Sequence, residues 1–171
     1  MKMRINYIAS ITLIILSVLV SCEKQNPDNI DVDTFVEQLV FGLYDSNELP
    51  AFSESDIPAL LTYRNETTVI TNFPRNWLSS YSQPECRLGM YVLWTIESVR
   101  AIEIDSESLV GRFPSLNPVL ALKDASPLEL VNNDQSHLDA ANAYNDWWNS
   151  SYLFSDKMEI DPLEDTAYRW H

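Results

Sequence analysis

Glycine and basic residues are scarce in this sequence, and each shortage excludes a kind of function. Only three glycines occur in 171 residues. None lies in a nucleotide-binding motif, so a glycine-rich loop that holds phosphate groups is excluded. Lysine and arginine number 11 against 25 aspartates and glutamates, which gives a formal net charge of -14. Because such an acidic chain repels phosphates, nucleic acid and anionic lipid headgroups are poor partners.

Cysteine and histidine are equally rare, with two of each. A Cys86–His137 dyad is less expected than a buried apolar cysteine, because Cys86 lies in an apolar stretch. His137 with Asp134 and Asp139 could bind a metal weakly, but a solvated histidine among surface acids is the simpler interpretation. A carboxylate pair for glycoside hydrolysis stays open, although nothing singles out one pair. We therefore expect no metal, no cofactor and no enzyme activity.

The first 21 residues have the pattern of a secretory signal. Lys2 and Arg4 precede the apolar run Ile5–Val20, as in signal peptides that are removed from the mature protein. The run ends in LVSC at positions 19–22, which resembles the lipobox of bacterial lipoproteins. The resemblance implies cleavage before Cys22 and acylation of this residue, and several acyl chains together anchor a protein stably. The alternative is an uncleaved membrane anchor, for which the apolar run is short.

The chain after the signal has the size of one domain. Residues 22–32 are expected to form the lipid anchor and a polar linker, and residues 33–171 a single domain. The N-terminal lipid would be the contact with the membrane and would place the protein in the cell envelope, at the outer membrane. With Cys22 lipidated, only Cys86 remains, so no intramolecular disulfide can form.

The stretch Glu85–Ile104 predicts the central buried helix of this domain. Its apolar residues cover almost the whole circumference of a helix, so it needs neighbours on several sides. A membrane span is disfavoured because polar residues interrupt its second half. Gly89 lowers the helix propensity and suggests a close helix crossing or a distorted first turn.

Helical spacing of apolar residues predicts three more helices, and the fold class is therefore mainly α. The first, capped by Asp33 or Thr34, runs to about Asp45; the others lie near residues 53–63 and 134–149. The best strand candidate, Thr67–Thr71, cannot form a sheet alone. We expect a single helical domain around the buried central helix.

Two Phe-Pro pairs, Phe73-Pro74 and Phe113-Pro114, have a spacing that suits helical pairs of the HEAT type. The simpler interpretation is that both pairs lie in structured loops, where phenylalanine fills the core and proline fixes the turn.

Several segments together carry a resemblance to a known family. They are DIPALL at 56–61, TNFPRN at 71–76 with SSY at 79–81, CRLGM at 86–90, LWTIESVR at 93–100, FPS at 113–115 and NP at 117–118. Over about residues 49–122 the chain is similar to a family of uncharacterised lipoproteins from gut-type Bacteroidota. The resemblance implies a location in the envelope, but it carries no known activity and transfers no catalytic residue.

Aromatic residues near the C terminus are candidate binding residues. Trp147, Trp148 and Tyr152 precede a tail rich in acids, and exposed aromatics beside carboxylates are typical of sugar recognition. Adjacent tryptophans point about 100° apart on a helix, so both cannot face one core. Aromatics that close a small core give the same pattern, and we favour that interpretation.

Three polar residues complete the candidates. Glu97 and Arg100 are neighbours on one helix face and could form the polar floor of a binding cleft, or a structural pair that fixes loops on the helix. Asp165-Thr166-Ala167 resembles the short motif for protein O-glycosylation in the same bacteria, with Thr166 as the acceptor.

These observations favour a lipid-anchored envelope protein of the non-catalytic type, an interaction protein or accessory subunit of an envelope complex. The alternative is a glycan-binding lipoprotein that uses the C-terminal aromatics. A glycoside hydrolase is third.

Overall fold

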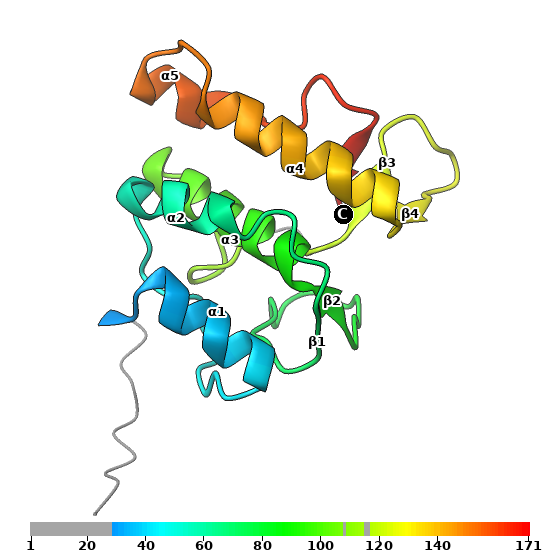
Figure 1. Cartoon of the computed structure of the whole chain (residues 1–171). Helices are drawn as coiled ribbons and strands as arrows, with labels where there is room; N and C mark the ends of the chain where they lie inside the picture. The colour runs from blue at the N-terminus through cyan, green and yellow to red at the C-terminus, as the bar shows by residue number, and fades with distance from the viewer. Residues whose placement is uncertain (1–28, 108, 115–116) are drawn as a thin grey trace, which may run out of the picture.

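Helix α3, Leu88–Glu103, runs through the middle of the protein, and helices on several sides pack against it (Figure 1). The computed structural model describes residues 29–107, 109–114 and 117–171. The predicted signal and Cys22 lie outside the described residues. Every residue from Leu88 to Arg100 is buried, and one cluster of buried side chains extends from Ile30 to Trp170 around this helix. The prediction of a central buried helix is confirmed.

The start of α3 lies three residues later than expected. Cys86 and Arg87 form a short strand, β2, in place of the first turn of the helix. The first N–H groups of α3 donate hydrogen bonds to residues 66–68: the Leu88 N–H donates to the Thr68 carbonyl and the Gly89 N–H to the Glu66 carbonyl, both at 2.8 Å. These bonds satisfy donors that a helix start leaves without helical partners.

Close packing requires a glycine at position 89. A close helix crossing was one of the two explanations that the sequence suggested for Gly89. A Cβ atom at this position would lie 2.5 Å from the Arg64 carbonyl oxygen and 2.6 Å from His137 Nε2. Residue 64 follows helix α2 (Ile57–Thr62), and His137 belongs to helix α4 (Asp134–Trp148). A glycine therefore allows both helices to approach the first turn of α3.

Helix α1, Val32–Phe41, is shorter than predicted and is capped elsewhere. The Asp31 side chain accepts a 2.8 Å hydrogen bond from the Thr34 N–H, so Asp31 is the cap in place of Asp33 or Thr34. The helix ends at Gly42, which adopts φ 67°. Glycine takes this left-handed conformation without strain, so the helix stops before Asp45.

The two other predicted helices are confirmed in position. A 3-10 turn, η2 (Glu54–Asp56), leads into α2, and the Asp56 carboxylate accepts the Ser53 N–H at 2.8 Å. Asn133 caps α4 by accepting the Ser136 N–H at 2.9 Å. Ala140, Ala141 and Tyr144 lie on the buried face of α4, whereas Leu138 is exposed.

The prediction of a mainly α fold is wrong. In the described residues, five α-helices account for 40% of the structure, and two small antiparallel sheets add 10% strand. Strand β1 (Val69–Ile70) pairs with β2 (Cys86–Arg87). A second sheet has the order β4-β3-β5, formed by Leu130–Val131, Leu120–Leu122 and Tyr168–Trp170. Helix α5, Phe154–Glu159, was also not predicted.

The two Phe-Pro pairs lie in loops, and no described helix contains them. Both phenylalanines are buried. The Tyr91 hydroxyl donates to the Pro74 carbonyl at 2.8 Å, and the Asn76 amide donates to the Pro114 carbonyl at 3.2 Å. The loops are thus tied to α3 and to each other, which does not correspond to stacked helical pairs.

Within the described parts of the chain, no helix combines the length and the apolar character needed to cross a membrane.

Candidate functional site

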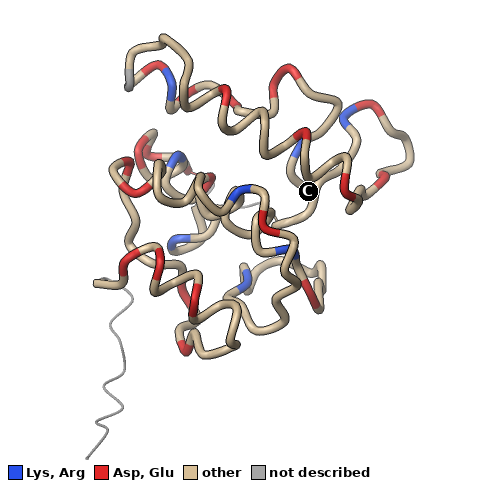
Figure 2. The backbone as a smooth tube through the Cα atoms, in the orientation of Figure 1, with Lys and Arg blue, Asp and Glu red and all other residues tan. Residues whose placement is uncertain are grey.

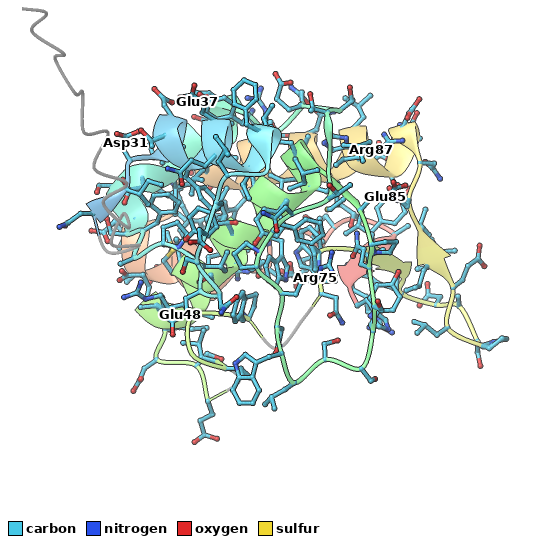
Figure 3. All side chains as sticks on the ribbon, turned by 90° about the horizontal axis from the view of Figure 1, so that it is seen from below. Asp31, Glu37, Glu48, Arg75, Glu85 and Arg87 are labelled. Atoms are coloured by element: carbon cyan, nitrogen blue, oxygen red, sulfur yellow. The ribbon has the colours of Figure 1, made fainter. Side chains whose placement is uncertain are left out.

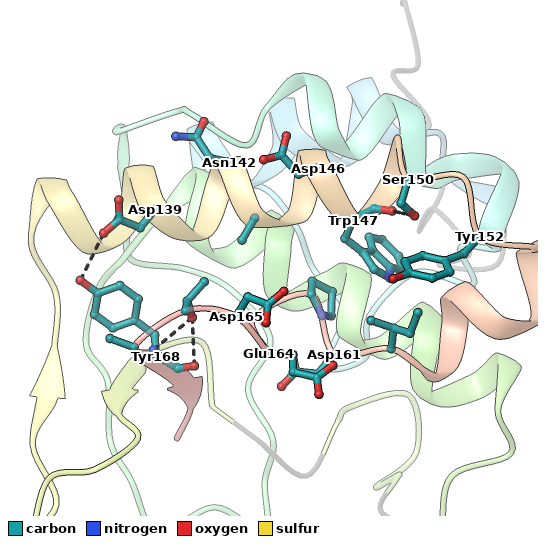
Figure 4. Close-up of a pocket in the computed structure, with 15 residues that line it drawn as sticks. Asp139, Asn142, Asp146, Trp147, Ser150, Tyr152, Asp161, Glu164, Asp165 and Tyr168 are labelled. Carbon is teal, nitrogen blue, oxygen red and sulfur yellow. Dashed lines mark hydrogen bonds between the residues drawn. The ribbon is translucent and has the colours of Figure 1, made fainter.

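A groove of about 800 Å³ runs between α4 and the segment from Ile160 to Tyr168 (Figure 4). Polar side chains at helical spacing on α4, Asp139, Asn142 and Asp146, form one wall. The C-terminal segment forms the other wall, and Figure 4 shows its acidic side chains across from the helix. The volume lies within the usual range of ligand pockets.

The groove is strongly acidic. Five carboxylates line it: Asp139, Asp146, Asp161, Glu164 and Asp165. None of the described residues that line it is a lysine or arginine, and Figure 2 shows acidic positions along both walls. Nearby cations are engaged by the backbone: Lys123 Nζ donates to the Leu163 and Glu164 carbonyls at 2.7 and 2.6 Å, and Lys157 Nζ to the Trp148 carbonyl at 2.6 Å. These two ammonium groups reduce the negative potential of the groove only in part, because five carboxylates line it.

The structure brings two of the three predicted aromatics into this groove. Tyr152 is 58% exposed and lines it. Trp147 also lines it but is buried, and its indole N–H donates to the Lys157 carbonyl at 2.8 Å. Trp148 is half-buried and lies outside the lining, with the Lys157 ammonium 5.1 Å from its ring centre. As expected, the adjacent tryptophans face different surroundings.

Glu97 and Arg100 lie beneath the groove and do not line it. They are 7% and 6% exposed, and an Arg100 guanidinium nitrogen lies 2.6 Å from a Glu97 carboxylate oxygen. The Tyr144 hydroxyl donates to the other Glu97 oxygen. Burial raises the pKa of Glu97, although the Arg100 charge opposes this shift. Burial also raises the pKa of the Tyr144 hydroxyl well above its ordinary value, so it stays a donor.

This buried network supports the wall and floor of the groove. Arg100 donates to the Ile160 carbonyl at 2.6 Å, and its guanidinium carbon lies 5.7 Å from the Trp147 ring centre. Ile160 and Trp147 both line the groove. The arrangement matches the structural interpretation of the pair, which fixes a segment on the helix.

Thr166 lines the same groove, where its hydroxyl holds a turn. Its Oγ1 donates to the Leu163 carbonyl at 2.8 Å and accepts the Tyr168 N–H at 3.1 Å. Transfer of a sugar to this oxygen would require the turn to open, because the oxygen is engaged on both sides.

The acidic stripe on α4 is the part of the site that sequence reasoning missed. Asp139 accepts a 3.3 Å hydrogen bond from the Tyr168 hydroxyl and thereby joins the two walls. Burial, followed by the Asp139 charge, raises the pKa of Tyr168. The positions 139, 142 and 146 fall on one helix face, and this spacing could have identified the stripe.

The residues that were candidates for a nucleophile or for metal ligands are buried or engaged in contacts that stabilise the fold. Burial raises the pKa of Cys86 to about 12, which removes the thiolate needed for nucleophilic attack. His137 is buried and not solvated as expected; its Nε2 donates to the Arg64 carbonyl at 2.8 Å. Asp134 pairs with Arg87 at 2.7 Å instead. No cluster of three or more His, Cys, Asp or Glu side chains in the described residues could hold a metal ion.

No curated protein and no solved structure matches this chain. The family model described as "Domain of unknown function (DUF4943)" matches residues 26–171. This range includes every helix and strand described above, together with the acidic groove. The chain therefore belongs to the DUF4943 family.

Proposed function

We propose that this protein is a lipid-anchored cell-envelope protein that acts by binding and not by catalysis, as an interaction protein or accessory subunit. The observation that carries the proposal is the acidic groove between α4 and the C-terminal segment. A rigid groove with five carboxylates favours a partner that presents lysine or arginine side chains, because opposite charges across an interface give orientation and fast association.

Tyr152 adds a contact that suits the same partner. Its exposed ring borders the carboxylates, and a lysine or arginine that enters the groove can stack on an aromatic face while it pairs with an acid. The buried Glu97–Arg100 network would keep the groove open in a fixed shape, which lowers the entropy cost of binding.

The location rests on the N-terminal sequence. The proposed lipid on Cys22 and the linker between Cys22 and the buried Ile30 would tether the domain to the outer membrane of a Bacteroidota-type cell. The test is Cys22→Ala, which should leave the signal uncleaved and abolish labelling by radioactive palmitate in growing cells. Normal processing and labelling of this variant would contradict the lipoprotein assignment.

The groove is tested by crosslinking and pull-down from intact membranes. The triple variant Asp146→Asn, Glu164→Gln, Asp165→Asn removes three exposed carboxylates of the groove. We expect it to recover several-fold less partner than the wild type, and the wild-type yield should fall as salt rises, because salt screens exposed charges.

A matched control is available on other surfaces. Glu37→Gln, Asp124→Asn, Glu129→Gln changes the net charge equally at exposed positions outside the groove. It should recover the partner normally. Equal losses in both variants, or recovery of free monomer alone from the wild type, would contradict the proposal.

Glycan binding in the same groove is the second candidate, favoured by the exposed Tyr152 beside hydrogen-bonding acids. Tyr152→Ala separates it from protein binding, since a stacked sugar would lose most of its affinity, whereas charge pairing with a protein would weaken only slightly.

A further inference from the structure

A second groove lies on the opposite side of the core, between the loop that follows α1 and the loop that follows β1. It has a volume of about 750 Å³ and is lined by residues 44–47, residues 71–75 and Trp77. None of these residues belongs to the acidic groove.

Trp77 is the distinctive residue of this groove. It is 72% exposed, and the next residue, Leu78, is 62% exposed. A tryptophan is seldom left this open. The loop around it is nevertheless fixed: the buried Asn76 side chain donates to the Pro114 carbonyl and accepts the Leu78 N–H at 3.0 Å. The fold thus presents the indole from a rigid base.

Both walls of the groove are also held in place. The Tyr44 hydroxyl donates to the Glu48 carbonyl at 2.8 Å, and the Asn72 amide donates to the Gly42 carbonyl at 2.8 Å, which ties the two loops together. Arg75 lies over the Phe73 ring, 4.6 Å from its centre. Arg75 and Glu48 are both visible on the face seen in Figure 3.

The lining offers many hydrogen-bonding groups and little net charge. Asp45 is its one acid and Arg75 its one base; Ser46, Asn47, Thr71 and Asn72 supply hydroxyl and amide groups. The acidic groove, by contrast, has five carboxylates. A ligand here is expected to be neutral, rich in hydroxyl groups and able to stack an apolar face on an indole.

We propose that this groove is a carbohydrate-binding site in which Trp77 is the stacking platform for a neutral sugar ring and Asp45, Asn47, Asn72 and Arg75 bind its hydroxyl groups. The indole face covers the C–H face of a pyranose, and carboxylate, amide and guanidinium groups pair with hydroxyls at its edge. A lipid bilayer fits the site less well, because insertion of Trp77 would also bring Asp45 and Arg75 towards an apolar medium.

The test is a titration of the full-length protein, purified in a detergent without sugar headgroups, with maltotriose, cellotriose, mannotriose and xylotriose. Tryptophan fluorescence should show a saturable shift with at least one of these sugars. Trp77→Ala should weaken the affinity about tenfold or more, since a stacked aromatic contact is lost. Trp77→Tyr should keep most of the affinity, and the exposed position predicts unchanged thermal unfolding for both variants.

Leu153→Ala is the matched control, since it removes an apolar side chain that is as exposed as Trp77, at 72%, and lines neither groove. It should bind the sugar as the wild type does. The proposal is overturned if no sugar gives a saturable response, or if Trp77→Ala keeps the affinity of the wild type.

A further experiment distinguishes sugar binding by Trp77 from insertion of Trp77 into a lipid bilayer. The protein is reconstituted in vesicles of phosphatidylethanolamine and phosphatidylglycerol with brominated acyl chains, and the wild type is compared with Trp77→Phe. Quenching that disappears in the variant would show that Trp77 inserts into the bilayer and would overturn the carbohydrate assignment.

Discussion

Glu97 and Arg100 form the most consequential pair of single residues, because both charges lie in the core. Arg100 contacts the Glu97 carboxylate and the Ile160 carbonyl, and Tyr144 donates to Glu97 while it accepts the Trp170 indole N–H at 2.8 Å. Removing two charges from water costs several kcal/mol, which such a network offsets only when all of its members are present. The pair therefore gives specific geometry more than net stability.

Arg100→Met should destabilise the protein by about 3–5 kcal/mol, because it leaves the Glu97 carboxylate buried without a cation. The double variant Glu97→Leu, Arg100→Met should recover most of that loss, since no buried charge remains. Urea unfolding of the single and double variants measures the coupling. A double variant as unstable as the sum of the two single variants would show that the charges do not depend on each other.

At the scale of elements, Gly89 sets how closely α2 and α4 approach α3. Gly89→Ala would normally stabilise a helix by about 1 kcal/mol. Here we expect a net loss of about 1–3 kcal/mol, because the added methyl group overlaps the Arg64 carbonyl and the His137 ring.

Gly111→Ala is the control for this prediction. It has no atom within 4 Å of the new methyl group and meets only the strain of φ 62°. Thermal unfolding should show the larger loss for Gly89→Ala. A gain in stability for Gly89→Ala would mean that the helices can separate without cost.

Helices were the elements that the sequence allowed us to predict, because α2, α3 and α4 carry apolar spacing over several residues. Of the strands, only β1 was indicated, by the strand candidate Thr67–Thr71 that contains it. Strands β2 to β5 were not predictable, since they have only two or three residues each and show no alternation. Their partners are distant in sequence: Leu120 pairs with both Val131 and Trp170. Gly42 does indicate the end of α1, because glycine is common directly after a helix. The apolar pattern continues beyond Gly42, however, and therefore predicted a longer helix.

The candidate sites were predictable to a smaller extent. Tyr152 and Trp147 do meet in one groove. The exposure of Trp77 had no signature, because a tryptophan in a loop after proline fits a buried or an exposed position equally well. Only the fold places it beside Asp45 and Asn47, from another loop.

At the scale of the whole molecule, stability at mildly acidic pH depends on two buried groups with opposite effects. Burial lowers the pKa of His137 from its ordinary value of 6.5; the Arg87 charge acts in the same direction, whereas the bond to the Arg64 carbonyl and the Asp134 charge oppose it. Burial raises the pKa of Glu97 above its ordinary value of 4.5. The folded state thus resists a proton on His137 and favours one on Glu97.

The direction in which His137 changes the free energy of unfolding with pH follows from proton linkage. Below about pH 6.5 the unfolded chain binds a proton at this histidine more readily than the folded protein does. The free energy of unfolding that His137 contributes above this pH is therefore lost as the pH falls through the pKa of His137 in the folded state, which is lower.

The free energy of unfolding should therefore fall from about pH 7 to about pH 5, and it should fall less in His137→Gln, whose amide can still donate to the Arg64 carbonyl. Glu97 has the opposite effect on the free energy of unfolding. Its pKa is raised in the folded state, so protonation at lower pH removes the free-energy cost of burying its charge. Urea unfolding of both proteins across this range isolates the histidine, since the surface carboxylates are common to both. Parallel curves would show that His137 is protonated equally in the folded and unfolded states.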